Sequence, residues 1–276
     1  MKNLWVNAQK LWSFLCFLPW VEKSEVVAAL AKILVARIFS QPTTVISRGG
    51  FQIRAGLSSG QGLWCALAGS WYEPELDFLC KTLKPGDTLV DIGANIGIYS
   101  LYGARSVGPA GRVFAFEPNP PCFKILQENL QINRIQNAEA VPGAVSSFAG
   151  KTILTGEATR WNSLRLGQAK PGSGMLTTEV AVLTLDNFFS ALSSAQLRII
   201  KIDAEGQEDQ VLAGARQTIS IYRPILIIED LGGESKPIYD IRLAALGYEV
   251  LPRQKSVLGL PSPNLIYAQR NDPVFG

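Results

Sequence analysis

The sequence predicts a doubly wound α/β fold, built on a mostly parallel Rossmann-like sheet with an antiparallel hairpin near the C-terminus. Between residues 73 and 231, short continuous apolar runs alternate with helix-like segments, which is the pattern of a parallel sheet covered by helices on both faces. The runs at 247–252 and 264–269 are close enough in the chain to pair as a hairpin. We expect this fold to occupy residues 41–276, after a helical extension over residues 1–40.

The predicted elements follow one another in a regular order. The first helix, over residues 73–83, has Pro74 in its first turn and stops before Pro85 and Gly86. Further helices are expected at 96–106, 120–133 and 208–219. Strands are expected at 88–92, 112–118, 138–145, 180–189, 197–206 and 224–231. Neither the polar stretch at 41–70 nor the segment at 148–180 shows such a pattern, so we predict irregular structure in both.

The composition excludes several classes of protein. Residues 1–40 hold five basic and two acidic residues, so the other 236 residues balance at 21 of each and create no broad positive field. We therefore expect no nucleic-acid partner. The four cysteines are widely spaced, which favours reduced thiols in a cytoplasmic protein over a disulfide framework or a zinc site. The chain has no histidine, so any proton transfer falls to a carboxylate, a tyrosine, a lysine or water.

Residues 1–40 allow two interpretations. The run "LWSFLCFLPW" at 11–20 is too short to span a bilayer as a helix, and "VVAALAKILVARIF" at 26–39 is compatible with a helix. We prefer a helical layer that packs on the α/β body or on a second subunit of a homo-oligomer. The alternative is a peripheral membrane anchor that places its three tryptophans among the lipid headgroups.

The residues at the strand ends indicate a bound cofactor. Asp91 closes one apolar run, and Gly93 and Gly97 follow in a turn where the backbone can approach a ligand. Glu117 closes the next predicted strand, where a carboxylate can accept both hydroxyls of a ribose. An adenosyl compound is therefore implied.

Two kinds of adenosyl compound can be separated by charge and glycine spacing. A dinucleotide prefers the spacing G-x-G-x-x-G, whereas this turn reads G-x-x-x-G. Asp91 would repel the pyrophosphate of a dinucleotide and attract an ammonium or sulfonium cation. The residues therefore favour a cationic adenosyl ligand over a nicotinamide dinucleotide.

Eight segments stand in a fixed order along the chain. They are "YEPEL" (72–76), "KPGDTLVDIGANIGIYSL" (84–101), "VFAFEPNP" (113–120), "ENLQIN" (128–133), "GAVSS" (143–147), "LTLDNF" (183–188), "IKIDAEGQEDQVLAGA" (200–215) and "ILIIED" (225–230). In this order and spacing they resemble the FkbM family of S-adenosylmethionine-dependent methyltransferases, within the class I Rossmann-like group. The resemblance runs from residue 72 to about residue 231 and leaves out residues 1–40.

The resemblance implies a binding site for S-adenosylmethionine. In methyltransferases of this class, the strand-end acid and the glycine turn hold the methionine part of the cofactor. Here that role falls to Asp91, Gly93, Ala94, Asn95 and Gly97.

The resemblance also assigns the adenosine part. Glu117 would hold the ribose, and Pro118 and Asn119 would shape the adenine edge. Where many relatives of the wider class carry an Asp after the third strand, this chain has Ala144, so Val145 and backbone groups would serve instead. Tyr72 and Glu73, just ahead of the first helix, are either a packing pair or the rim of this pocket.

Two acids in the segment "KIDAEGQE", Asp203 and Glu205, are the candidates for catalysis. Transfer of a methyl group to a hydroxyl needs a group that takes the proton, and Asp203 ends a strand at the expected crevice. Glu205 and Glu208 either take part or stabilise the start of the following helix. Asp203, Glu205 and Glu229 could alternatively hold a divalent cation, although we predict no metal site.

We expect an S-adenosylmethionine-dependent methyltransferase that acts on a hydroxyl of a sugar, a glycolipid or another secondary metabolite. Two other classes remain as alternatives. One is a nicotinamide-dependent oxidoreductase, and the other is a non-catalytic Rossmann-like module that serves in binding or membrane scaffolding.

Overall fold

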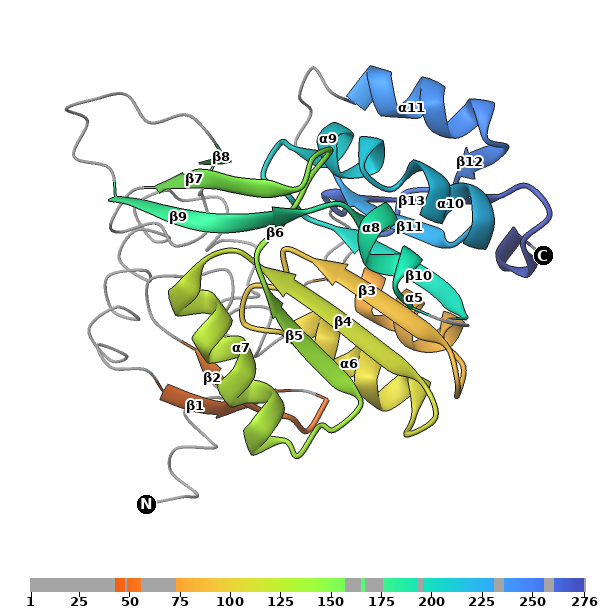
Figure 1. Cartoon of the computed structure of the whole chain (residues 1–276). Helices are drawn as coiled ribbons and strands as arrows, with labels where there is room; N and C mark the ends of the chain where they lie inside the picture. Colours follow the sequence, from red (N-terminus) through yellow and green to blue (C-terminus); the bar gives the residue numbers. More distant parts are fainter. Residues whose placement is uncertain are drawn as a thin grey trace, which may run out of the picture.

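A computed structural model of the chain describes residues 43–47, 49–55, 73–156, 165–166, 176–192, 196–230, 236–255 and 261–275. A seven-stranded sheet lies at its centre, with the strand order β12–β13–β11–β10–β3–β4–β5 (Figure 1). The strands are β3 (Thr88–Ile92), β4 (Arg112–Glu117), β5 (Ala138–Pro142), β10 (Leu197–Ile202), β11 (Ile225–Glu229), β12 (Tyr248–Val250) and β13 (Asn264–Gln269). The predicted doubly wound α/β fold is confirmed.

The sheet is parallel from β5 to β11 and antiparallel beyond it. β3 pairs in parallel with β4 and with β10, and β10 pairs in parallel with β11. β13 then runs antiparallel to β11, and β12 runs antiparallel to β13 at the edge of the sheet. The predicted C-terminal hairpin is therefore confirmed.

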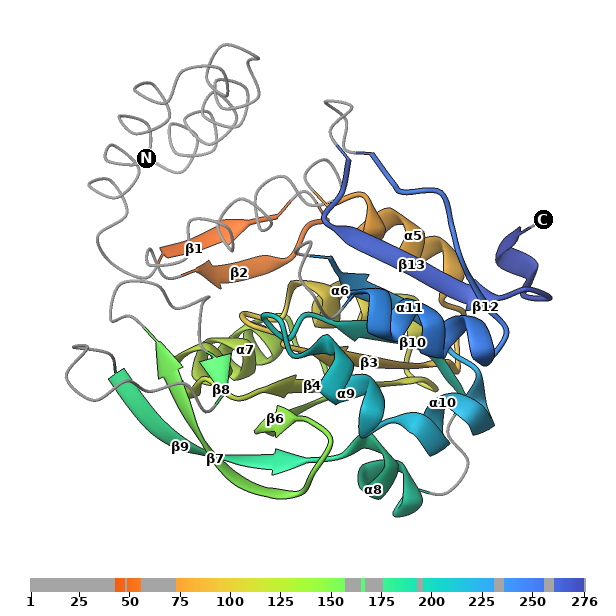
Figure 2. The ribbon, with the colours of Figure 1, turned by 90° about the horizontal axis from the view of Figure 1, so that it is seen from above.

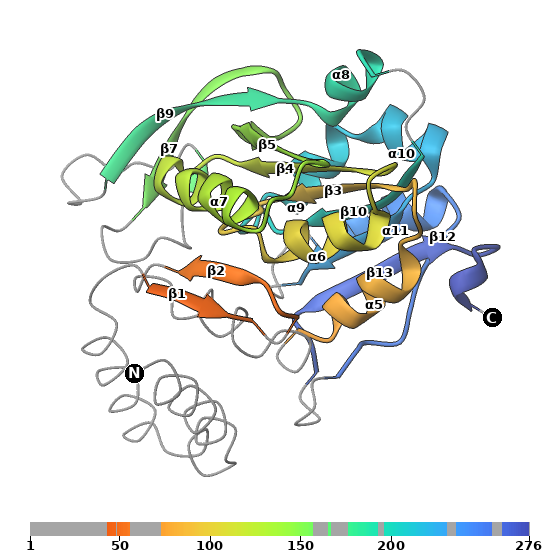
Figure 3. The same ribbon diagram turned by 90° about the horizontal axis from the view of Figure 1, so that it is seen from below.

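Helices cover both faces of this sheet (Figures 1, 2 and 3). On one face lie α5 (Glu75–Thr82), α6 (Ile98–Val107) and α7 (Pro120–Ile132). On the other lie α8 (Leu185–Ser190), α9 (Glu208–Ala213), α10 (Arg216–Tyr222) and α11 (Lys236–Ala245). Successive strand residues alternate between the two hydrophobic clusters, as the pleat of a strand requires; Leu89 packs into the first and Val90 into the second.

A second, four-stranded sheet occupies the segment for which we predicted irregular structure. Its strands are β6 (Ala144–Val145), β7 (Gly150–Gly156), β8 (Arg165–Leu166) and β9 (Leu176–Leu183), in the order β6–β9–β7–β8. The single strand predicted at 138–145 is also wrong, because the chain leaves the main sheet at Gly143. That glycine has a φ of +146°, and Val145 beyond it pairs with Leu183 in the small sheet.

Three further elements differ from the prediction, the first being the strand expected at 197–206, which ends at Ile202. The strand expected at 180–189 ends at Leu183, and α8 begins behind Thr184, whose hydroxyl accepts a hydrogen bond from the N–H of Asn187 at 3.1 Å. The helix expected at 208–219 is two helices, α9 and α10. α10 has its own start because the Asp186 carboxylate accepts a hydrogen bond from the N–H of Thr218 at 2.8 Å.

An antiparallel hairpin of β1 (Thr43–Ile46) and β2 (Gln52–Ala55) lies within the stretch predicted as irregular at 41–70. Asn129 in α7 and Asn133, the residue directly after α7, hydrogen-bond to the backbone of β2 as a neighbouring strand would. Asn133 bonds the N–H and the carbonyl of Gln52 at 2.9 and 2.6 Å, and Asn129 bonds those of Arg54 at 2.6 and 3.1 Å. The side chains of a helix thus satisfy an edge of the hairpin.

In the described part of the chain, none of the helices is both long and apolar enough to span a lipid bilayer. Residues 1–40, and with them the choice between a packing layer and a membrane anchor, lie outside the described residues.

Candidate functional site

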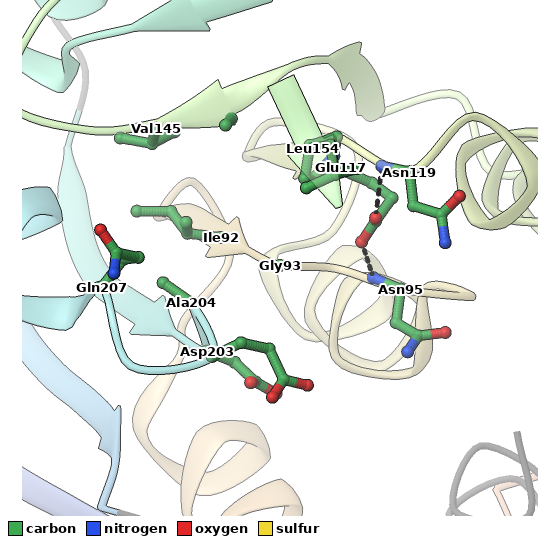
Figure 4. A pocket seen from close by; sticks show the side chains of 13 residues that line it. Ile92, Gly93, Asn95, Glu117, Asn119, Val145, Leu154, Asp203, Ala204 and Gln207 are labelled. Carbon is green, nitrogen blue, oxygen red and sulfur yellow. Dashed lines mark hydrogen bonds between the residues drawn. The ribbon is translucent and has the colours of Figure 1, made fainter. Parts of the chain in front are cut away.

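A pocket of about 700 Å³, part of it open to solvent, lies at the carboxyl ends of β3, β4 and β10 (Figure 4). The chain leaves β3 in one direction toward β4 and later returns on the other side to β10, so this is the switch point where open α/β sheets bind ligands. The described residues that line it are Ile92, Gly93, Asn95, Glu117, Pro118, Asn119, Ala144, Val145, Leu154, Asp203, Ala204, Glu205 and Gln207.

The turn after β3 forms one wall of the pocket. The backbone N–H groups of Gly93 and Ala94 both donate to the carbonyl of Phe116, each at 3.0 Å, which ties the turn to β4. Gly93 has a φ of +72°, and a Cβ added there would lie 1.9 Å from the carbonyl oxygen of Asp203. The position therefore accepts only glycine, because any side chain would separate the two strand ends that border the pocket.

The Glu117 carboxylate joins two turns at the pocket wall (Figure 4). One of its oxygens accepts the N–H of Asn95 at 2.7 Å, and the other accepts the N–H of Asn119 at 2.8 Å. Burial raises the pKa of Glu117 to about 7, although these two hydrogen bonds oppose the rise. Each carboxylate oxygen has a second lone pair, so Glu117 can still accept hydrogen bonds from a ligand in the pocket.

The lining of the pocket is acidic on one side and apolar on another. Three carboxyl side chains, those of Glu117, Asp203 and Glu205, border it, and no lysine or arginine is among the described residues that line it. Ile92, Val145 and Leu154 supply the apolar side (Figure 4). Such a pocket suits a ligand with a flat apolar part, hydroxyl groups and a positive charge.

Asp91 lies behind this lining and is fully buried. The Ser100 hydroxyl donates to its Oδ2 at 2.6 Å, whereas its Oδ1 has no hydrogen-bond partner among the described residues. Burial raises the pKa of Asp91, and the ammonium group of Lys201, which stands opposite it in the sheet, opposes the rise. Asp91 therefore belongs to a buried charge cluster with Lys201 and does not itself line the pocket.

The catalytic candidate Asp203 comes directly after β10. Lys201, two residues earlier on the same face of the strand, donates to Asp203 Oδ2 at 2.8 Å. Burial lowers the pKa of Lys201, but the charges of Asp203 and Asp91 outweigh it, so the net shift is upward. Lys201 also stands over the ring of Tyr99, with its Nζ 5.0 Å from the ring centre.

The turn that follows Asp203 is stabilised by hydrogen bonds to the side chain of Glu208. Glu205 has a left-handed backbone with a φ of +52°, which is uncommon for a residue with a side chain. The buried carboxylate of Glu208 accepts the N–H groups of Ala204 and Gly206 at 3.2 and 3.0 Å. Glu208 therefore supports the turn, whereas Glu205 lines the pocket.

Most of the residues that the sequence assigned to the site do line the pocket: Gly93, Asn95, Glu117, Pro118, Asn119, Ala144, Val145, Asp203 and Glu205. Ala94 and Gly97 belong to the same turn but lie outside the lining, as does the half-buried Glu73 ahead of α5. Tyr72 lies outside the described residues.

Sequence reasoning missed four lining residues, Ile92, Leu154, Ala204 and Gln207. It also overlooked Lys201, although a lysine inside the apolar run "LRIIKI" was a signal that a buried carboxylate lies opposite. In the described ranges, no three Asp, Glu or Cys side chains are gathered closely enough to hold a metal ion.

Comparisons with known proteins find similar chains. The sequence model of a family described as "Methyltransferase FkbM domain" matches residues 91–250. Over 158 residues the chain is 28% identical to the 31-O-demethyl-FK506 methyltransferase FkbM of Streptomyces tacrolimicus, a match that covers 48% of this chain and 60% of that protein. Over 194 residues it is 23% identical to the hexuronic acid methyltransferase AglP of Haloferax volcanii, which covers 68% of this chain and 75% of that protein.

A shorter stretch of 68 residues is 43% identical to methyltransferase sdnD of Sordaria araneosa, covering 24% of this chain and 26% of that protein. These matches span between 26% and 75% of the lengths of the three relatives. Among solved structures, a methyltransferase FkbM from Methylobacillus flagellatus KT is similar at a TM-score of 0.47 and 18% identity, covering 88% of this chain and 60% of that one.

Proposed function

The family model covers more than half of the chain, so the protein belongs to the FkbM methyltransferase family, and we propose that it transfers the methyl group of S-adenosylmethionine to a hydroxyl of a small-molecule acceptor. The proposal extends the family assignment to a cofactor, a reaction and a set of residues. It keeps the acceptor class expected from the sequence, a sugar, a glycolipid or another secondary metabolite.

The observation that carries the proposal is the charge of the pocket lining. Three carboxyl groups and no cationic side chain, among the described residues, border a pocket at the switch point of the sheet. This arrangement repels the pyrophosphate of a nicotinamide dinucleotide, which normally lies against backbone N–H groups at a helix N-terminus. It attracts the sulfonium and ammonium groups of S-adenosylmethionine.

The lining residues fit the other parts of the same molecule. Glu117 is held at the pocket wall by two backbone N–H groups and retains lone pairs for the two ribose hydroxyls. Ile92, Val145 and Leu154 offer an apolar surface for an adenine ring. Asp91, with one oxygen unpaired among the described residues, comes two residues before the turn on which the methionine part would lie.

Glu117 and the turn after β3 would hold S-adenosylmethionine, which would supply an electrophilic methyl carbon and leave as S-adenosylhomocysteine with the electron pair of the carbon–sulfur bond. The chain contributes alignment and removal of the proton. In the proposal, the Asp203 carboxylate accepts the hydroxyl proton as the new bond forms and later releases it to solvent. Glu205, on the adjacent turn, lines the same pocket.

Transfer to an oxygen is supported by the name of one relative, a 31-O-demethyl-FK506 methyltransferase. Another relative is named as a hexuronic acid methyltransferase, which supports a sugar-derived acceptor. The buried acids around Asp203 also suit a neutral hydroxyl as the methyl acceptor better than an anionic group. They would repel a carboxylate or phosphate near the transferred methyl group.

Calorimetric titration with S-adenosylhomocysteine tests the cofactor, with NAD(H) as the comparison. We expect saturable binding of S-adenosylhomocysteine and none of NAD(H); the reverse result would favour an oxidoreductase. A screen of glycan and lipid fractions with methyl-labelled S-adenosylmethionine then tests the acceptor class. Intact cofactor binding without methyl transfer to any fraction would favour a binding module over an enzyme.

A further inference from the structure

The polar cluster around Asp203 contains groups that the proposed reaction does not by itself require. Lys201 and Asp91 stand opposite each other on β10 and β3. Ile202 and Ile228 are partners on β10 and β11, so the next residues along these strands, Asp203 and Glu229, end side by side at the carboxyl edge of the sheet. Three carboxyl groups and one ammonium group therefore meet beside the pocket.

The charges of this cluster do not balance if every group is ionised. Asp91 is 0% exposed and Lys201 is 4% exposed, so little solvent screens them. Three ionised carboxylates around a single ammonium would leave two uncompensated negative charges in a largely buried site, which is costly. This electrostatic cost is lower if one of the carboxyl groups keeps its proton.

Glu229 is the group that best fits the protonated form. It ends beside Asp203 at the edge of the sheet, and its Oε2 is buried without a partner among the described residues. Burial, then the neighbouring Asp203 carboxylate, raise the pKa of Glu229 to about 9, although Lys201 opposes the rise. The charge of Glu205 also raises it, and on the far side β13 presents the uncharged Asn264 opposite Glu229.

We propose that Glu229 is a positioning residue, which donates a hydrogen bond from its carboxylic acid to Asp203 and, together with Lys201, holds the Asp203 carboxylate toward the acceptor hydroxyl. The inference rests on the role of Asp203 in the proposed methyl transfer. Lys201 holds Asp203 Oδ2 from within the sheet at 2.8 Å. Glu229 approaches from the neighbouring strand, so that two donors from different strands restrict the rotation of one carboxylate.

The hydrogen bond is tested without any knowledge of the acceptor. Glutamate labelled with carbon-13 at the side-chain carboxyl is introduced into the full chain, and the carboxyl resonances are titrated by NMR. We expect one glutamate carboxyl resonance to titrate near pH 9. This resonance should be absent in Glu229→Gln, and its titration midpoint should move to lower pH in Asp203→Asn. Glu139→Gln, an exposed glutamate on β5, is the matched control and leaves the signal in place.

Two results of the titration overturn the proposal. One is a Glu229 carboxyl that titrates near the ordinary value of 4.5. The other is a high titration of Glu229 that Asp203→Asn does not move, because Glu229 would then be protonated for reasons unrelated to Asp203.

Activity measurements separate this proposal from the proposed function. Glu229 does not line the cofactor pocket, so Glu229→Ala should bind S-adenosylhomocysteine as the wild type does. If the wild type itself fails to bind, the proposed function is refuted while the NMR titration still decides the carboxyl pair. With the acceptor from the methyl-labelling screen, Glu229→Ala should lower kcat by about 10- to 100-fold with an unchanged KM for the donor.

The conservative variant distinguishes positioning from a purely structural role. Glu229→Gln keeps a donor toward Asp203, so it should retain more kcat than Glu229→Ala. The wild-type kcat should fall as the pH rises through about 9, where Glu229 loses its proton, and this alkaline loss should be absent in Glu229→Gln. Equal kcat in Glu229→Ala and the wild type would overturn the proposal.

Discussion

Replacing Glu117 with glutamine should remove a pH-dependent loss of stability and weaken the binding of the cofactor. Glu117 is 7% exposed, and burial raises its pKa from 4.5 to about 7. A carboxyl group whose pKa is raised in the folded state stabilises the fold below its unfolded pKa, and this stability is lost as the pH rises through the folded pKa. Glutamine stays neutral and avoids that loss, although its NH₂ group replaces one of the two oxygens that accept backbone N–H groups, which lowers the stability by an amount that does not depend on pH.

The size of the effect follows from the two pKa values. Each tenfold difference in proton affinity is worth about 1.4 kcal/mol, so the ionised Glu117 side chain costs about 3 kcal/mol of unfolding free energy once the pH is above 7. The unfolding free energy of Glu117→Gln relative to that of the wild type should therefore rise by about 2 kcal/mol between pH 5.5 and pH 8. Urea unfolding at both pH values measures it, with the exposed Glu139→Gln on β5 as a control that stays level with the wild type.

Cofactor binding should change in the opposite direction. Hydrogen bonds to a charged group are worth about 1.5–3 kcal/mol, so Glu117→Gln should weaken S-adenosylhomocysteine binding by about 10- to 150-fold. In the wild type the affinity should rise as the pH increases through about 7, and this rise should be absent in the variant. A variant that binds S-adenosylhomocysteine as tightly as the wild type, or whose stability relative to the wild type does not rise between pH 5.5 and pH 8, would refute the reasoning.

Three other substitutions test the frame around the pocket. Gly93→Ala should lower the unfolding free energy by more than about 2 kcal/mol in urea unfolding, because the new Cβ meets the carbonyl of Asp203 at 1.9 Å; an unchanged midpoint would contradict this. Asn129→Ala should speed hydrogen exchange at the amide of Arg54, which loses its partner at 2.6 Å, and unchanged protection would count against the docking role. Lys201→Met should cost about 3–5 kcal/mol at pH 8 and less at pH 5.5, where the carboxylates left behind take up protons more readily; equal losses at both pH values would contradict the buried ion pair.

The main sheet could be predicted from the sequence because each of its central strands is apolar on both faces. Runs such as "TLVDI" and "ILIIE" lack the alternation of apolar and polar residues that a strand with one solvent-exposed face shows, and helices separate them in the chain. The strand ends then had to meet at one edge, which brought Glu117 and Asp203 to the same pocket before any coordinates were considered.

The small sheet could not be predicted in the same way. Its long strands, β7 and β9, pair over 150–156 and 176–182 across a long intervening segment, and β7 alternates only partly, with Lys151 and Ile153 exposed and Leu154 buried. Such pairings depend on contacts distant in sequence, which local patterns do not encode. The position of Leu154 in the pocket lining was hidden for this reason.

The site also contained ionisation states that no pattern specifies. Spacing placed Asp91 and Glu229 at strand ends, but only the register of β3, β10 and β11 shows that Lys201 lies among them. The protonation of a buried acid depends on its distance to such neighbours and on the lost solvent, and both are properties of the folded chain.

The asparagine that docks the β1–β2 hairpin has a thermodynamic consequence for the cofactor. The Asn129 amide bonds the backbone of Arg54 on the hairpin and also donates to the carbonyl of Ile96, inside the turn that borders the pocket, at 2.8 Å. One side chain therefore contributes to the order of both parts. Coupling between two equilibria is reciprocal. If cofactor binding increases the equilibrium constant for hairpin docking by some factor, hairpin docking increases the affinity for the cofactor by the same factor.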